Sequence, residues 1–254
     1  PLGRFAGADE TYTIEALMQN GWALQSGTSH FLGQNFARAF DVYYQTPDEK
    51  RELVWATSWG VTTRLMGAMV MTHSDDLGLR LPPAVAPKQA SNVVIVPITR
   101  GPGEDTDLVN KAVDGIVKQL RAARIRVKVD DRPNMRPGAK YFEWEAKGVP
   151  LRVELGPRDA KAGVAVVVKR TGGEKMSLPT DDGFASSIQQ QLEAVYDDLW
   201  RDAQDNLAKG TIPVSSYAEM KAHIESGDSG RAGMYLAAWT CDTENEDFIQ
   251  QDSK

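Results

Sequence analysis

The sequence predicts an α+β region followed by an α/β domain, and two patterns carry that prediction. Residues 4–83 mix strand-like alternation with short helical segments, as in domains built on an antiparallel sheet. Residues 92–206 alternate apolar strand runs with helical segments, which is typical of an open βαβ-type sheet. Prolines stiffen the connector between them and end regular structure. We therefore predict three parts: residues 1–89, 90–210 and a short α/β unit at 211–254.

Each element follows from its local pattern. In the first part, we expect strands at 11–17, 40–44 and 53–58, helices at 32–40 and 61–73, and a polar turn at 45–51. In the second part, we expect strands at 93–98, 125–129, 151–155 and 164–168, and helices at 108–123, 141–147 and 183–206. The third part is expected to contain a helix at 217–225, a strand at 234–239 and an acidic, weakly patterned tail.

Composition excludes several classes of protein. The chain is 41% hydrophobic and 25% charged, as in ordinary soluble globular proteins. Its longest nearly apolar stretch, Leu65–Met71, is far too short to span a bilayer, and no secretory leader is visible. The single cysteine, Cys241, excludes a disulfide framework and indicates a reducing compartment.

Charge is unevenly distributed along the chain. The net charge is −6, yet residues 100–175 carry 17 Lys+Arg against 11 Asp+Glu. A basic middle in an acidic protein is the footprint of a local contact with a phosphate backbone. A solvated α/β surface would give the same balance, so charge alone does not separate the two.

The run from Gly21 to His30 contains candidate binding residues. Small residues at 26, 27 and 29 allow a ligand to approach the backbone. Gln25, Thr28 and His30 alternate with them, so their polar groups could point to one side of a pocket. A capped turn would show the same pattern.

The run from Thr57 to Pro83 contains a second candidate. It reads as a strand that turns at residues 59–60 into a helix, with Arg64 just inside the first turn. Free backbone N–H groups at a helix start already favour anions. The planar, permanently charged guanidinium of Arg64 suits a phosphate or a purine face.

Together these runs resemble the prolyl-tRNA synthetase family of class II aminoacyl-tRNA synthetases, in its eukaryote- and archaeon-like form. Residues 57–83 resemble motif 3 of that class. The other matching runs follow in the family's order and spacing: RFAGA at 4–8, TYTIEA at 11–16, ALQ at 23–25, GTSH at 27–30 and LGQNF at 32–36.

The resemblance implies a partial class II antiparallel-sheet catalytic domain. By that resemblance, ATP is contacted by Gln25, Ser26, Gly27, Thr28, Thr62 and Arg64, and His30 lies at the proline pocket. Magnesium would accompany the nucleotide by bridging its phosphates. No catalytic residue is assigned, because activation is an attack of the proline carboxylate on the α-phosphate, helped by positioning and charge neutralisation.

The second part resembles the family's anticodon-binding domain, through residues 136–141, 143–145, 147–152 and 156–159. Prolyl anticodons share two guanines, whose edges arginine and carboxylate groups can read in unstacked loops. The resemblance points to Glu145 and Arg152, with Arg158 and Lys140 as further candidates. The alternative is an internal surface pair, Glu145 with residue 147 or Arg158 with residue 159.

The chain also departs from the family. Family members carry motifs 1 and 2 upstream of the first matching run, so the sequence is expected to be a C-terminal portion that is inactive by itself in proline-dependent ATP–pyrophosphate exchange. Its last part resembles the start of a terminal domain in which several cysteines bind zinc in some members. Only Cys241 is present and Asn245 stands near the place of a second, so no zinc site is expected.

The expected function is that of a proline–tRNA ligase that uses ATP to activate proline and transfers it to tRNA(Pro). The expected partners are tRNA(Pro), proline and, for the full-length enzyme, a second copy in a homodimer. The expected compartment is the cytoplasm or an organelle stroma, with no membrane association. A non-catalytic fragment that binds tRNA or protein, or a structural subunit of a larger assembly, would also fit the sequence.

Overall fold

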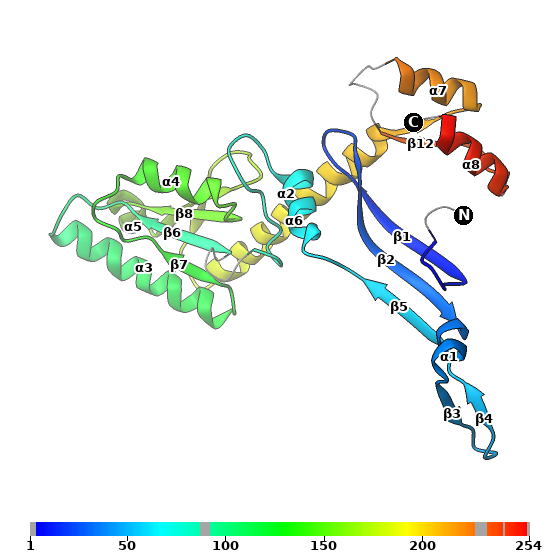
Figure 1. Cartoon of the computed structure of the whole chain (residues 1–254). Helices are drawn as coiled ribbons and strands as arrows, with labels where there is room; N and C mark the ends of the chain where they lie inside the picture. The colour runs from blue at the N-terminus through cyan, green and yellow to red at the C-terminus, as the bar shows by residue number, and fades with distance from the viewer. Residues whose placement is uncertain (1–3, 87–91, 227–232, 241, 253–254) are drawn as a thin grey trace. The chain divides into compact units, whose positions relative to one another are not determined.

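The computed structural model describes residues 4–86, 92–226, 233–240 and 242–252. The chain divides into two compact units, one formed by residues 1–72 and 205–254 and the other by residues 73–204. The division falls at the end of helix α2 (Arg64–His73) and within the long helix α6 (Phe184–Gly210). Figure 1 shows both units and labels most of their helices and strands.

The first unit is built on a three-stranded antiparallel sheet. Its order is β1-β2-β5, formed by β1 (Glu10–Leu17), β2 (Ala23–Gly33) and β5 (Ala56–Gly60). Gly21, at φ +82°, lets the chain turn sharply between β1 and β2. Between β2 and β5 lie α1 (Asn35–Phe40) and a small hairpin of β3 (Tyr43–Gln45) and β4 (Arg51–Leu53).

Several predicted boundaries in this unit were wrong. The predicted strand 53–58 is divided between β4 and β5, because residues 54–55 belong to neither strand. The predicted helix 32–40 begins only at Asn35, since the first residues of that run still belong to β2. Residues 25–30, for which a capped turn was the alternative interpretation, lie wholly within β2. Pairing with β1, and from Thr28 onward also with β5, makes a strand of residues that are too small and polar to look like one.

The second unit is built on a five-stranded mixed sheet of order β10-β9-β8-β6-β7. Its strands are β6 (Val93–Pro97), β7 (Val127–Val129), β8 (Leu151–Leu155), β9 (Val164–Lys169) and β10 (Met176–Pro179). Strand β6 pairs in parallel with β7 and β8, whereas β9 runs antiparallel to β8 and β10. The predicted α/β alternation is therefore present. Strand β10 was missed because it is short and follows a turn with Gly172 and Gly173.

Helices cover the two faces of this sheet unequally. Helix α3 (Glu104–Ala122) and the first part of α6 bury an apolar stripe against the alternate residues of β6 and β8 that face them. These strand residues are Val93, Ile95, Leu151, Val153 and Leu155. On the other face, Trp144 of α4 (Pro137–Ala146) packs on a smaller cluster with Val94, Val96 and Val149. In β8 the residues that point to this second face are polar: Arg152 and Glu154.

The segment from Asp75 to Ala86 belongs to the second unit and is tied to it by arginine side chains. Arg170 donates two hydrogen bonds to the carboxylate of Asp75. Arg126 donates to the carbonyl oxygens of Pro83 and Ala86, at 2.8 and 2.6 Å. This part of the predicted proline-rich connector is therefore anchored, since the partly buried guanidinium of Arg126 is directed at two of its carbonyl groups. The rest of the connector lies outside the described residues.

Short elements complete the chain. Helix α5 (Pro157–Ala162), which sequence reasoning missed, follows β8 directly, and the long helix α6 leads into β11 (Thr211–Pro213). Strand β11 pairs in parallel with β12 (Met234–Leu236), and α7 (Tyr217–Glu225) lies between them in sequence. The predicted weakly patterned tail contains helix α8 (Thr243–Asp252). Among the described residues, every helix is too short or too polar to cross a membrane.

Candidate nucleotide and RNA sites

Three of the predicted ligand-binding residues lie on one face of β2. Gln25, Thr28 and His30 are separated by unequal steps, so a regular strand would not direct all three to one side. A bulge resolves the mismatch, because Ser26 is the extra residue that has no partner on β1. The cross-strand partners of the three are alternate residues of β1: Glu15, Thr13 and Thr11. We call the surface formed by Gln25, Thr28 and His30 the β2 face.

His30 is the buried member of the β2 face, with 8% of its surface exposed. Its Nδ1 lies 3.0 Å from the hydroxyl of Thr11, and its ring stacks on Phe5 with ring centroids 4.6 Å apart. Both contacts fix the orientation of the imidazole ring. This geometry suits a residue that shapes a pocket better than one that moves in and out of it.

The start of α2 presents Arg64 to solvent. The hydroxyl of Thr62 accepts a hydrogen bond from the backbone N–H of Arg64, at 3.3 Å, as a capping residue does. The Arg64 side chain is exposed, and its guanidinium has no acceptor among the described residues. Residue 60, just before this turn, pairs with Thr28. The pairing therefore connects the β2 face to the helix start that carries Thr62 and Arg64.

The remaining two predicted residues of β2 have backbone roles. Gly27 is buried, and a Cβ atom added there would lie 3.4 Å from a methyl group of Val61. The Ser26 hydroxyl donates to the carbonyl oxygen of Leu24, at 3.2 Å. Neither side chain adds a free donor to the β2 face.

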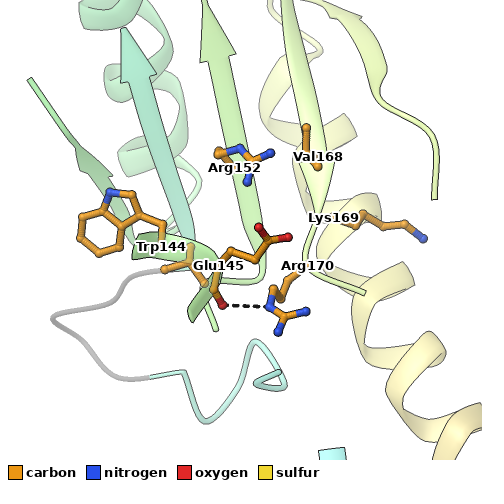
Figure 2. A pocket seen from close by; sticks show the side chains of 7 residues that line it. Trp144, Glu145, Arg152, Val168, Lys169 and Arg170 are labelled. Atoms are coloured by element: carbon orange, nitrogen blue, oxygen red, sulfur yellow. Dashed lines mark hydrogen bonds between the residues drawn. The ribbon is translucent and has the colours of Figure 1, made fainter. Parts of the chain in front are cut away.

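In the second unit, Glu145 and Arg152 line one small pocket. The pocket lies between the end of α4, the start of β8 and the end of β9, and its lining includes Lys169 and Arg170. Figure 2 shows Glu145, Arg152 and Arg170 around it. Nε of Arg170 donates to the backbone carbonyl of Glu145, at 2.9 Å, which fixes the backbone that carries the Glu145 side chain. The structure thus brings together two residues that are seven positions apart in sequence.

The alternative surface pairs are not formed. Lys147 donates to Glu143, at 2.5 Å, rather than to Glu145. The Asp159 carboxylate accepts the backbone N–H of Gly156, at 2.8 Å, rather than pairing with its neighbour in sequence. Among the described residues, the Glu145 carboxylate and the Arg158 guanidinium therefore have no partner that would commit them to the fold.

Lys140 and Arg158 lie apart from that pocket. The Lys140 side chain is 5% exposed, and its amine donates to the Asp130 carbonyl oxygen at 2.9 Å. This geometry favours a structural role for Lys140. Arg158 lies in the first turn of α5 and lines an open crevice at the carboxyl ends of β6 and β8, together with Arg100 and Lys161. Side chains at that end of parallel strands commonly face ligands.

Comparison with known proteins is consistent with this geometry. Residues 92–198 match the family model described as "Anticodon binding domain". The chain contains an anticodon-binding domain. Its matched residues include β6 to β10 and most of α6, together with Glu145, Arg152, Arg158 and Lys140.

The whole chain is also similar to curated proline–tRNA ligases. It is 48% identical over 251 residues to the proline–tRNA ligase of Bacteroides fragilis, covering 99% of this chain and 48% of that protein. It is 47% identical to that of Porphyromonas gingivalis and 44% identical to that of Chlorobium luteolum, covering 49% and 50% of those proteins. The chain thus spans about half the length of the curated relatives it matches.

The anticodon-binding domain contains a polar cluster that sequence reasoning missed. Arg152 lies over the ring of Tyr141, with its guanidinium carbon 4.4 Å from the ring centroid, and its Nε donates to Glu154 at 3.1 Å. Lys175 also donates to Glu154, at 2.8 Å. We call these four residues the β8 cluster: Tyr141, Arg152, Glu154 and Lys175. Strand alternation would have shown that residues 152 and 154 share a face, but nothing local indicates Lys175.

Burial and charge set the protonation of this cluster. Burial raises the pKa of Tyr141 to about 12, and the nearby Glu154 carboxylate adds to that effect. The phenol is therefore neutral at physiological pH, and its ring offers an uncharged face to the guanidinium of Arg152.

We expected no zinc site because Cys241 is the single cysteine, and Cys241 lies outside the described residues. Within the part of the chain that is described, no three histidine, cysteine or acidic side chains come close enough to hold a metal ion.

Proposed function

We propose that this chain is part of a proline–tRNA ligase, which uses ATP to activate proline and transfers it to tRNA(Pro). The observation that carries the proposal is identity of 44–48% to proline–tRNA ligases over 99% of the chain. In this proposal, residues 1–89 belong to the catalytic domain of the eukaryote- and archaeon-like type, residues 90–210 bind the anticodon and residues 211–254 begin a terminal domain.

The β2 face and the start of α2 fit a nucleotide. Gln25 and Thr28 offer an amide and a hydroxyl on one face, and Arg64 offers a guanidinium that no described residue accepts. Planar cations of this kind bind phosphates or stack on purines. Under this proposal the proline carboxylate attacks the α-phosphate of ATP, which is bound with its magnesium, and pyrophosphate leaves. His30 shapes the proline pocket, and the full-length enzyme forms a homodimer in the cytoplasm or an organelle stroma.

Glu145 and Arg152 fit recognition of an anticodon guanine. Guanine offers two acceptors, O6 and N7, to a guanidinium, and N–H donors on its other edge to a carboxylate. The pocket that the two residues share therefore has the complementary pair of groups. Arg158, at the crevice beyond β8, is proposed to contact a neighbouring nucleotide. That Lys140 contacts the anticodon stays a prediction, because its buried amine already donates to the carbonyl oxygen of Asp130.

The test is titration of the 254-residue chain with a fluorescent anticodon stem-loop of tRNA(Pro), followed by anisotropy. We expect tighter binding than to a stem-loop whose two shared guanines are replaced by adenines, and Arg152→Ala should reduce that preference. A good base contact contributes about 1–3 kcal/mol of discrimination. Equal affinity for both stem-loops would refute anticodon recognition by this chain. The catalytic half of the proposal is tested in the full-length enzyme, where Arg64→Ala should weaken ATP binding in proline-dependent pyrophosphate exchange.

A further inference from the structure

We propose that Glu154 is a positioning residue, which holds Arg152 in the orientation that reads a guanine edge. This inference rests on the proposed function, because it assumes that Arg152 contacts an anticodon base. It extends that function to residues outside the pocket that Glu145 and Arg152 share. The proposal concerns the β8 cluster.

The contacts of Arg152 fix its guanidinium in two directions. The ring of Tyr141 lies 4.4 Å from the guanidinium carbon and limits tilting of the plane. Glu154 accepts from Nε, at 3.1 Å, and limits rotation within the plane. Since Arg152 and Glu154 are two residues apart on one strand, their side chains leave the sheet on the same face.

These contacts leave one edge of the guanidinium available. A guanidinium carries five N–H donors, of which Nε contributes one. Among the described residues, none accepts a hydrogen bond from the two terminal nitrogens of Arg152. Those two nitrogens form the edge that binds O6 and N7 of guanine in a bidentate contact.

Glu154 is itself held in place. Its side chain is 8% exposed, and Lys175 donates to both of its carboxylate oxygens, at 3.1 and 2.8 Å. A carboxylate this buried is maintained by its two cationic partners. A flexible arginine loses side-chain entropy when it binds a base, so fixing it beforehand improves both affinity and selectivity.

Charge makes the role of Glu154 distinguishable from a general contribution to binding. Glu154 is an acidic residue in a surface proposed to bind an anion, so its removal should strengthen non-specific attraction to the phosphate backbone. If it positions Arg152, the same removal should nevertheless weaken discrimination between guanine and adenine. A residue that only stabilises the fold would not change these two quantities in opposite directions.

The experiment measures dissociation constants of the 254-residue chain for the tRNA(Pro) stem-loop and for stem-loops with either shared guanine changed to adenine. For Glu154→Ala, we expect discrimination at one position to fall roughly tenfold, as for Arg152→Ala, while affinity for the variant RNA holds or increases. Glu154→Gln keeps an acceptor for Nε and should retain most of the discrimination. The double variant should lose no more than Arg152→Ala alone, because both changes remove one contact.

Arg201→Ala is the control matched to Arg152→Ala. It removes one positive charge from α6, which covers the opposite face of the sheet, and its side chain is 63% exposed. Its discrimination should equal that of the unmodified chain. Thermal unfolding of every variant separates lost structure from lost recognition. If Glu154→Ala does not fold, Tyr141→Leu decides instead: reduced discrimination supports the inference and unchanged discrimination overturns it.

The positioning role of Glu154 and anticodon recognition by this chain are refuted by different results. If Arg152→Ala loses discrimination and Glu154→Ala keeps it, the positioning role is overturned and the anticodon site stands. If the unmodified chain does not prefer the native stem-loop, anticodon recognition by this chain is overturned, and the inference falls with it.

Discussion

Replacement of Asp130 by asparagine should destabilise the anticodon-binding domain strongly, because Asp130 collects several donors in a buried position. Its carboxylate accepts from Arg132, at 2.8 and 2.6 Å, and from the indole N–H of Trp144, at 2.7 Å. The Lys140 amine lies 3.8 Å from it and is almost fully buried. Asparagine has the same shape but no charge, and its amide nitrogen would face donors.

The expected loss of stability depends on which partners of Asp130 can be rehydrated. Removal of one partner of a buried ion pair costs about 3–5 kcal/mol, since the other charge stays buried and unpaired. Lys140 is in that situation, whereas Arg132 is 42% exposed and can be rehydrated. We therefore expect the low end, about 3 kcal/mol, which is a large part of the roughly 5–15 kcal/mol that stabilises a typical domain.

Native-state hydrogen exchange of the 254-residue chain is the assay. Amides of β6 and β8 lie in the core, so their protection reports the largest opening reactions of the second unit. A loss of about 3 kcal/mol should speed their exchange roughly 100-fold. Glu143→Gln is the control, because it also contacts Arg132 but lies at the surface, where an ion pair contributes about 0–1 kcal/mol. Equal effects of the two substitutions would refute the argument that burial decides the cost.

The same carboxylate predicts a pH dependence. Hydrogen bonds from Arg132 hold the pKa of Asp130 well below its ordinary value of 3.8. A carboxyl group with a lowered pKa stabilises the folded state above its unfolded-state pKa, and this contribution is lost as the pH falls through the folded-state value. The stability difference between the unmodified chain and Asp130→Asn should thus be full at pH 6 and shrink below about pH 4. A difference that is constant down to pH 2 would contradict this assignment.

Three further predictions concern the same unit. Gly148→Ala should lower the free energy of unfolding in urea by about 1–3 kcal/mol, since φ is +71° and the new Cβ would lie 2.8 Å from a backbone carbonyl oxygen. Gly101→Ala is the control and should cost less, because φ is +109° there but no atom lies within 4 Å of the new Cβ. Asp75→Asn should lower the melting temperature at pH 7 but not near pH 2, because hydrogen bonds from Arg170 lower the pKa of Asp75. Lys140→Met should lower stability and leave anticodon discrimination unchanged in the stem-loop titration; reduced discrimination at full stability would restore Lys140 to the binding site.

Elements of the second unit were predictable where the apolar pattern was strong. Strand β8 has the predicted bounds, because three of its five residues bury apolar side chains and Gly156 and Pro157 follow at once. Helix α5 was missed because six residues are too few to show a helical period. Its signal was capping chemistry: Pro157 in the first turn and Asp159 accepting the N–H of Gly156. Helix α8 was missed because an acidic segment with few apolar residues looks like an unstructured tail.

The β2 face shows a limit of spacing arguments. Residues 25, 28 and 30 do not share a face in either a regular strand or a regular helix. Only a bulge at Ser26 places them together, and its position depends on how β1 pairs with β2. The resemblance proposed these three residues together, but the geometric reason why they share a face comes from the pairing register.

In the anticodon-binding domain, the sequence alone could have predicted contacts between residues close together in the chain, but not contacts between residues far apart. Once residues 143–147 are helical, Lys147 faces Glu143, four positions earlier, and not Glu145, two positions earlier. That alternative could have been excluded from the sequence alone. The contact between Glu154 and Lys175 could not, because it joins residues 21 positions apart across β8, β9 and β10. A positioning residue of this kind is visible only after the sheet has formed, whereas Arg152, which we propose it orients, is found by its motif.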